Sequence, residues 1–176
     1  MKKTLLLITA FALFALSAAE LKVEFNAASP WKTVRNHSHR VKFETKEFKG
    51  KKATVVTLAN EVKTGDTAFC LATDFFSVKD KKNVKVKFSF LAAKGMQDFK
   101  GGGYWNNSVR FYDSAKKEIL PEAHIILPPA TGAYQEVTQE FPVPAKAVTA
   151  LLHFGFDNPN ITKNNIFAIT DVVITY

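Results

Sequence analysis

The residues best suited to bind a ligand lie in one short segment that follows three consecutive glycines at 101–103. The aromatic rings of Tyr104, Trp105 and Tyr112 can stack against the apolar C–H face of a sugar ring. Asn106 and Arg110 can hydrogen-bond the hydroxyl groups of the same sugar. A few polar groups set among aromatic surface are typical of small-molecule sites. The segment therefore predicts a carbohydrate-binding face, and an ordinary solvated face of a β-sheet is the alternative.

The period-two pattern of this segment determines which side chains point the same way, because side chains alternate between the two faces of a strand. Val109 and Phe111 are apolar and are expected to face the core. The residues that then point outward together are Tyr104, Asn106, Arg110 and Tyr112. Trp105 falls on the core side, or at the rim where the preceding loop frees it. His124 and His153 also have outward parity and are expected at solvated positions.

A carboxylate interrupts an apolar stripe near the end of the chain. Asp171 shares its expected strand face with Ile169 and Val173. A buried carboxylate has to be paired with a cation, hydrogen-bonded or bound to a metal ion. The sequence therefore predicts either a salt bridge with a Lys or Arg or a metal ion at Asp171.

Motifs of catalytic sites are not found in the sequence. It contains no Gly-x-Ser-x-Gly nucleophile elbow, no His-Glu-x-x-His metal motif and no phosphate-binding loop. Paired carboxylates could form a glycosidase site, since their separation is spatial. The acidic residues Glu118, Glu122, Glu136 and Glu140 are, however, expected to be exposed. Basic and aromatic residues are not interleaved as nucleic-acid binding requires, so we expect neither an enzyme nor a nucleic-acid-binding protein.

The elements that position these residues are predicted to be short β-strands. Alternation with period two recurs along the chain, as in 84–90, where apolar residues alternate with Lys and Ser, whereas helical periodicity is hard to find. Turn signals separate about ten strands. They are expected at 21–26, 40–47, 53–60, 67–76, 84–90, 109–112, 119–127, 134–143, 151–156 and 165–175. This pattern predicts an all-β, antiparallel sandwich of two sheets, each with one face in the core and one in water.

The first nineteen residues have the pattern of a secretory signal peptide. Lys2 and Lys3 precede an apolar run over 5–16, and small residues at 17–19 lead to Glu20. The run is shorter than the roughly 20 residues needed to cross a bilayer, and no later segment is long and apolar enough to do so. We therefore expect residues 1–19 to be removed and residues 20–176 to form a single exported domain, secreted or periplasmic.

The charge and the cysteine content limit the partners and the fold of that domain. The whole chain has 24 basic and 16 acidic residues, a formal charge of +8, and loss of Lys2 and Lys3 lowers this charge to +6. Positive charge and Arg110 would suit an acidic glycan. The lysines gather at 46–52 and 79–87, as on solvated strand edges, which predicts a monomer. Cys70 is the only cysteine, so a core rich in Phe has to stabilise the fold without an internal disulfide.

The order of these features resembles jelly-roll carbohydrate-binding modules, which have a galactose-binding-like β-sandwich. The matching pieces are 24–26 followed by Trp31, 48–56, 84–95, 108–113, 141–147 followed by 151–156, and 167–174. Together they cover nearly all of the chain after residue 19. The resemblance implies a secreted, non-catalytic protein that binds a poly- or oligosaccharide. A jelly-roll polysaccharide lyase or glycoside hydrolase is one alternative, and an envelope adhesion or protein-interaction domain is another.

The resemblance also implies one structural calcium ion. In such modules the ion is often held by a carboxylate of the last strand, with groups from the first strand and a nearby turn. The matching ligands here would be Asp171, Glu24 or Asn26, and Asp66. Calcium takes six to eight oxygen ligands, and a salt bridge at Asp171 is an equal contender.

Overall fold

The computed structural model describes residues 19–23, 32–33, 41–58, 67–94, 104–105, 107–157 and 166–176. Strands and turns make up these ranges, and no α-helix occurs in them. Accordingly, the described residues include no helix long and apolar enough to span a membrane. The predicted signal peptide, apart from Ala19, lies outside the described residues, as do Glu24, Asn26, Asp66 and Asn106.

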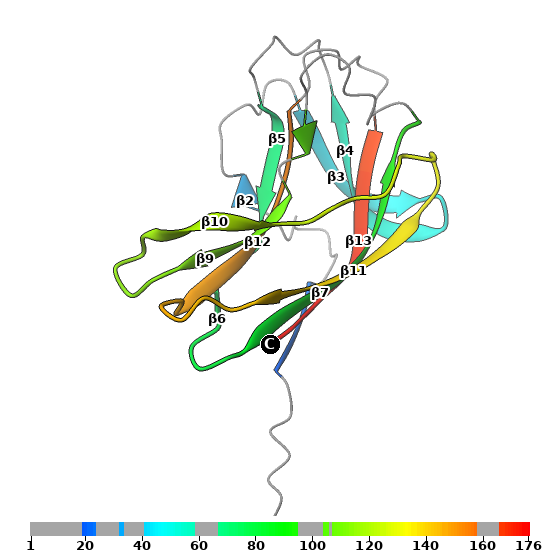
Figure 1. Cartoon of the computed structure of the whole chain (residues 1–176). Helices are drawn as coiled ribbons and strands as arrows, with labels where there is room; N and C mark the ends of the chain where they lie inside the picture. Colours follow the sequence, from blue (N-terminus) through cyan, green and yellow to red (C-terminus); the bar gives the residue numbers. More distant parts are fainter. Residues whose placement is uncertain are drawn as a thin grey trace, which may run out of the picture.

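Thirteen strands are found in the described ranges, and they form two antiparallel sheets (Figure 1). Sheet A has the order β11 (Gln135–Pro142), β7 (Asn83–Ala92), β13 (Ile166–Thr175), β4 (Lys51–Leu58) and β3 (Val41–Phe48), and β1 (Glu20–Lys22) also pairs with β13. Sheet B has the order β10 (Glu118–His124), β9 (Ser108–Tyr112), β12 (Thr149–Asp157), β5 (Thr67–Ala72) and β2 (Lys32–Thr33), and β6 (Phe76–Ser77) and β8 (Tyr104–Trp105) also pair with β12. The chain crosses repeatedly between the sheets, so the predicted jelly-roll sandwich is confirmed.

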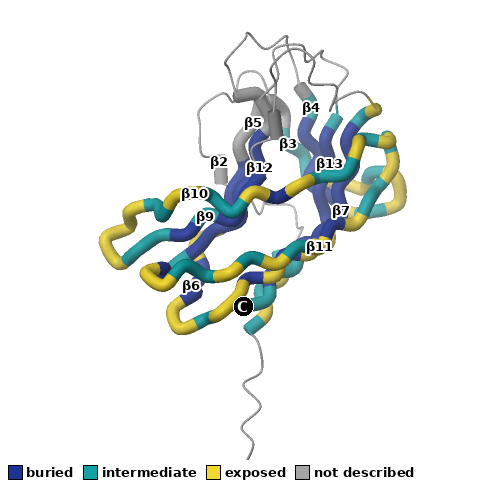
Figure 2. Tube along the Cα trace, viewed as in Figure 1, coloured by how far each residue is buried: buried dark blue, intermediate teal, exposed yellow. Residues whose placement is uncertain are grey.

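The buried residues lie between the two sheets (Figure 2). As predicted, Phe side chains are prominent in this core, since Phe88, Phe90, Phe154 and Phe167 are its largest fully buried side chains. Along β7 the apolar residues that alternate with polar ones are all buried, namely Val84, Val86, Phe88 and Phe90. Phe88 of sheet A meets Phe154 of sheet B edge to face, with ring centroids 5.0 Å apart. Because the chain has a single cysteine and therefore no internal disulfide, such aromatic contacts help to hold the two sheets together.

Part of the outer face of sheet A is also covered, although one face of each sheet was expected in water. Leu91 and Ala168 point away from the main core and are nevertheless buried, with Phe48 and Tyr134 packed against them. The Tyr134 hydroxyl donates a hydrogen bond to the Phe48 carbonyl oxygen at 3.1 Å. The segment that leads into β11 therefore covers a second, smaller apolar cluster on this face.

A β-bulge in β13 reverses the side-chain pattern of the last strand. The register of β13 against β7 shifts beside Asp171, whose φ is +55°. Before the bulge Phe167 and Ile169 face the core, and after it Val172 and Ile174 do. An extra residue in one strand has this effect because it changes the parity of all that follow. The prediction that Asp171 lies on the apolar face is therefore wrong, and its side chain is 53% exposed.

The strand expected at 67–76 is interrupted as well. It ends at Ala72, and pairing with β12 resumes at Phe76 in β6. Thr73 bridges the gap, since its backbone N–H donates to the Leu152 carbonyl and its hydroxyl oxygen accepts from the Leu152 N–H, both at 3.0 Å. Residues 74 and 75 are therefore left outside the ladder.

Candidate functional site

The predicted binding residues fall on sheet B, in β8 and β9. Val109 and Phe111 are buried in the core, and Arg110 and Tyr112 lie half-buried on the outer face, as parity predicts. Short strand β8 pairs with β12, so that its two residues, Tyr104 and Trp105, lie opposite Asp157 and Phe156 in the register. The side chains of these two residues, and the whole of Asn106, lie outside the described residues.

Arg110 lies at the centre of a network that includes residues of both β9 and β10. Its Nη2 is 3.3 Å from Oε1 of Glu122, and its Nε is 3.8 Å from Oε1 of Glu118. The hydroxyl of Ser108, which is fully buried, donates to Oε2 of Glu122 at 2.8 Å and accepts from Nε of Arg110 at 3.4 Å. We call these four residues the Arg110 network. Only 17% of the Arg110 side chain and 19% of the Glu122 side chain are exposed, so the polar atoms are held in fixed positions.

The expectation that Glu118 and Glu122 are exposed is wrong, whereas Glu136 and Glu140 are exposed as predicted. The register between β10 and β9 shifts between Ile119 and Ala123, with two more residues on β10 than on β9. The insertion of two residues preserves parity, so both carboxylates reach the face that Arg110 occupies. The sequence held one hint, since Glu118 and Glu122 each lie an even number of positions after Arg110 in a strand that follows a turn. The pairing register of β10 with β9 could not, however, be predicted from it.

The electrostatics of this face differ from those of the whole chain. Arg110 carries one positive charge and its two carboxylate partners carry two negative ones, so the network has a formal charge of −1. The pKa of Tyr112 is raised, first by burial and then by the charge of Glu118, although Arg110 opposes the shift. Tyr112 therefore remains a neutral phenol at physiological pH, able to donate and to accept hydrogen bonds.

The two histidines with outward parity have different surroundings. His124 is exposed, as expected. His153 lies opposite Ser108 in the register of β12 with β9, and it is buried, so its predicted solvated position is wrong. Next to it, the side-chain oxygen of Asn107 accepts a hydrogen bond from the Gly155 N–H at 3.3 Å. His153 and Asn107 are both buried, so neither side chain is open to a ligand.

Asp171 forms the salt bridge that was one of its two predicted states. Its Oδ2 is 2.6 Å from Nζ of Lys51, which also donates to the Ser89 hydroxyl at 3.2 Å and lies over the ring of Tyr134. Burial alone would raise the pKa of Asp171, but the hydrogen bond and charge of Lys51 outweigh it and hold the pKa below its usual value. Thus Lys51 joins the bulge of β13 to the segment that covers sheet A.

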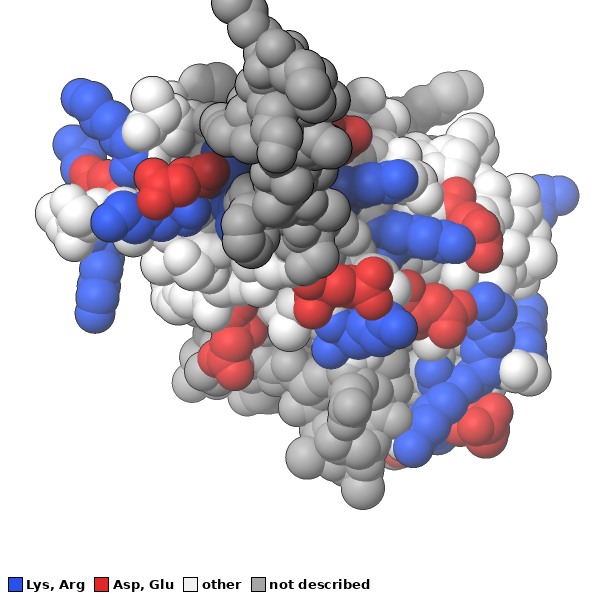
Figure 3. Space-filling view, turned by 90° about the horizontal axis from the view of Figure 1, so that it is seen from below, with Lys and Arg blue, Asp and Glu red and all other residues white. Residues whose placement is uncertain are grey.

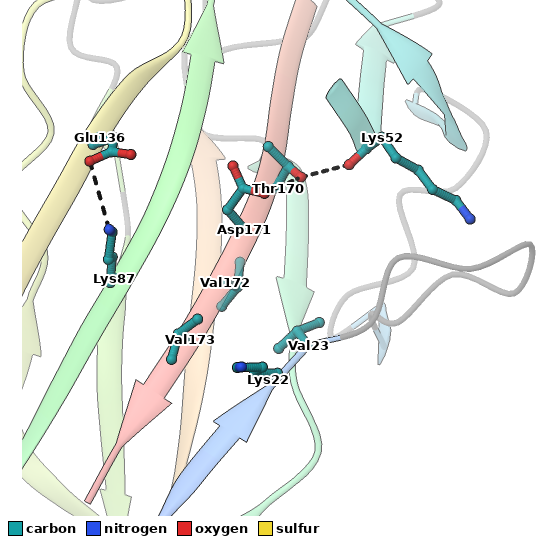
Figure 4. A pocket seen from close by; sticks show the side chains of 9 residues that line it. All are labelled: Lys22, Val23, Lys52, Lys87, Glu136, Thr170, Asp171, Val172 and Val173. Atoms are coloured by element: carbon teal, nitrogen blue, oxygen red, sulfur yellow. Dashed lines mark hydrogen bonds and ion pairs between the residues drawn. The ribbon is translucent and has the colours of Figure 1, made fainter. Parts of the chain in front are cut away.

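The bulge also opens a hollow of about 510 Å³ where the neighbour of β13 changes from β4 to β1. Figure 4 shows side chains of both charges around it, with Lys87 beside its ion-pair partner Glu136 on one side, Asp171 on β13 and Lys22 on β1. Seen from below, the described residues likewise carry acidic and basic side chains interspersed (Figure 3). This mixture is typical of a solvated face.

The calcium ion stays a prediction. Three of its four predicted ligands, Glu24, Asn26 and Asp66, lie outside the described residues, and the fourth, Asp171, is paired with Lys51. Within the described ranges, no three His, Cys, Asp or Glu side chains come close enough together to hold a metal ion.

Comparison with known proteins identifies the fold. No family model and no curated protein matches the sequence. Among solved structures, the enzymatically active domain of tailspike protein 4 of bacteriophage CBA120 matches at 14% identity and a TM-score of 0.60, over 86% of this chain and 20% of that one. The xylan-binding CBM22-1 domain of Xyn10C from Paenibacillus barcinonensis matches at 9% identity and a TM-score of 0.52, over 89% of this chain and 92% of that one. The family 29 carbohydrate-binding module CBM29_1 from Piromyces equi matches at 10% identity and a TM-score of 0.51, over 91% of each chain.

Identities this low show a shared fold. The chain has the β-sandwich of carbohydrate-binding modules, which confirms the resemblance of fold expected from the sequence. It spans nearly the whole length of the two modules but only about a fifth of the tailspike chain, whose structure is described as enzymatically active.

Proposed function

We propose that this protein is a non-catalytic carbohydrate-binding protein that holds a neutral glycan on the outer face of sheet B, at Tyr112 and the Arg110 network. The observation that carries the proposal is the fixed arrangement of half-buried donors and acceptors beside an aromatic ring. Arg110 and Glu122 are already held by each other and by Ser108. Side chains that are ordered before binding lose little conformational entropy when a ligand arrives. The proposal assigns the other predicted residues, Tyr104, Trp105 and Asn106, to the same site.

The charge of the network favours a neutral glycan over an acidic one. Arg110 is already paired with two carboxylates. An acidic sugar would have to displace one of them, and the released carboxylate would then repel the ligand. The hydroxyl groups of a neutral sugar can instead donate to Glu118 and Glu122 and interact with the phenol of Tyr112.

The same geometry supports binding over catalysis. A general base works best when its pKa lies near the working pH, and the pKa of Tyr112 is moved further above it. The two carboxylates on this face both lie beside one guanidinium group, with an oxygen of Glu122 at 3.3 Å and one of Glu118 at 3.8 Å. The likeness of fold to two carbohydrate-binding modules, nearly the whole length of which the chain spans, adds support for a binding role.

Export and monomeric state belong to the same proposal. Removal of residues 1–19 would leave Glu20, the first residue of β1, as the new N-terminus. Cleavage would remove the two backbone hydrogen bonds between Ala19 and Tyr176, at 2.8 and 2.9 Å, and leave the pairing of β1 with β13 from Glu20 opposite Thr175 onward.

Affinity electrophoresis against soluble polysaccharides tests the function. We expect migration to be slowed by at least one neutral polysaccharide from a panel of xylan, β-glucan and galactomannan, and not by alginate or polygalacturonate. Replacement of Arg110→Gln should abolish the effect, whereas Lys87→Gln, which removes an equal charge from the exposed face of sheet A, should not. The proposal is wrong if no polysaccharide slows the protein, or if the protein releases sugar products from any of them.

A further inference from the structure

An aromatic side chain that the sequence did not single out lies beside Tyr112. Phe75 belongs to the two residues that leave the ladder between β5 and β6, and it is 59% exposed. Its ring meets that of Tyr112 at 82°, with the centroids 5.1 Å apart. Irregular points in a strand commonly redirect a side chain, and here the interruption brings Phe75 to the face that carries Tyr112.

The two rings border a pocket of about 270 Å³ at the end of this face. Because the rings are nearly perpendicular, they form a corner in which a flat ligand can lie on one ring and touch the other. The rest of the lining comes from the turn after β9 and from the start of β12, namely Asp113, Ser114, Lys116, Val148 and Thr149. The pocket therefore combines aromatic surface with hydroxyl groups and one charge of each sign.

The walls of the pocket are held in place by the backbone around it. The Asp113 carboxylate accepts hydrogen bonds from the N–H groups of Ala115 and Lys117, each at 2.9 Å, which fixes the turn. On the other side, Thr73 fixes the start of the segment that carries Phe75 through its two bonds to Leu152. A pocket formed in this way needs little rearrangement before a ligand binds.

We propose that this pocket is a subsite for a single uncharged sugar ring, whose apolar face stacks on Phe75. The inference rests on the proposed glycan-binding function and extends it to a site that the Arg110 network does not include. Tyr112 lines the pocket and also lies beside Arg110, so a glycan chain can place one ring in the pocket while the next rings lie along β9 over the network. The hydroxyl groups of Ser114 and Thr149 suit a sugar better than a fully apolar ligand.

Variants of Phe75 that differ in ring and in size test this subsite. The probe is the neutral polysaccharide that slows the wild-type protein most in affinity electrophoresis, followed by calorimetric titration with its oligosaccharides. We expect Phe75→Ala and Phe75→Leu to weaken binding about tenfold, equivalent to about 1.4 kcal/mol, because both lack a ring face. Phe75→Tyr should bind like the wild type. The control is Ile126→Ala, which removes another exposed apolar side chain that lies outside the pocket, 77% exposed against 59% for Phe75.

The outcomes separate the subsite from the function. Unchanged affinity in Phe75→Ala, with the wild type still binding, overturns the subsite and leaves the glycan-binding function standing. Retained binding in Phe75→Leu, with loss in Phe75→Ala, overturns stacking in favour of simple apolar contact. No binding by the wild type overturns both proposals. Circular dichroism and the melting temperature show whether each variant is folded. If Phe75→Ala is not folded, comparison of Phe75→Tyr with Phe75→Leu still decides whether a sugar stacks on the ring at position 75.

Discussion

The Arg110 network makes a sharp prediction about stability, because a half-buried ion pair and an exposed one occur in the same molecule. Glu122 on sheet B and Glu136 on sheet A each form an ion pair. The Glu122 side chain is 19% exposed and the Glu136 side chain is 68% exposed. Replacement of each by Ala removes the same atoms, so the difference between the variants measures the effect of burial and of hydrogen bonding.

We expect Glu122→Ala to lower the free energy of unfolding by about 2 kcal/mol. Hydrogen bonds to charged groups contribute about 1.5–3 kcal/mol, and Glu122 accepts one from the buried Ser108 hydroxyl at 2.8 Å. Loss of one partner from a fully buried ion pair costs about 3–5 kcal/mol. The smaller value is expected here because Arg110 keeps Glu118, at 3.8 Å. An exposed pair such as Lys87–Glu136 contributes about 0–1 kcal/mol, so Glu136→Ala should have little effect.

Urea denaturation followed by circular dichroism gives the measurement, and the slope against urea should be unchanged in both variants. For a domain of this size, about 2 kcal/mol corresponds to a fall in melting temperature of about 4–8 °C. The double variant Arg110→Ala with Glu122→Ala should be destabilised by less than the sum of the two single variants, since each single change already removes the same Arg110–Glu122 ion pair. If Glu122→Ala and Glu136→Ala differ by less than about 0.5 kcal/mol, the network is an ordinary solvated face and the argument for preorganised binding groups fails.

Two further predictions concern the end of sheet A. The pKa of Asp171 is lowered in the folded state, so its ion pair with Lys51 stabilises the protein above the unfolded pKa of about 3.9 and loses this effect as the pH falls through the folded value. Asp171→Asn keeps a residue type that tolerates the positive φ, and it should cost less than about 1 kcal/mol at pH 7. The difference should persist down to a pH of about 4 and vanish only as the pH falls through the lowered pKa of Asp171; a difference that remains at still lower pH would contradict the ion-pair explanation. If a structural calcium ion binds the native state, added calcium should raise the melting temperature and a chelator should lower it. If neither treatment changes the melting temperature, the ion is excluded.

The parts of the fold that the sequence predicted depend on local alternation. In the first part of β7, buried Val and Phe residues alternate with exposed lysines, as expected of a regular strand. Parity also placed Val109 and Phe111 inside and Arg110 and Tyr112 outside. These predictions succeeded because side-chain direction within a regular strand depends only on the position along that strand.

The parts that the sequence did not predict depend on contacts between distant segments. Asp171 was assigned to the core face, and the bulge that moves it outward is held by Lys51, 120 residues earlier. The interruption that exposes Phe75 is held by the bonds of Thr73 to Leu152, 79 residues later. Glu122 reaches Arg110 because of a register shift between β10 and β9. Each irregularity changes the parity or the pairing of a strand, and a count of alternating residues in one segment contains no information about it.

These irregularities also explain why function is assigned to sheet B. The bulge in β13 places a carboxylate outside the core, but Lys51 is paired with it, so the feature is accounted for by stability. The interruption after β5 leaves the Phe75 ring largely exposed to solvent. The protein thereby forgoes the free energy that burial of this ring in the core would contribute. That ring borders a pocket next to Tyr112, and the extra residues of β10 bring two carboxylates to the same face. Two separate departures from regular pairing thus converge on one surface, and a glycan that contacts Phe75, Tyr112 and the Arg110 network would account for both.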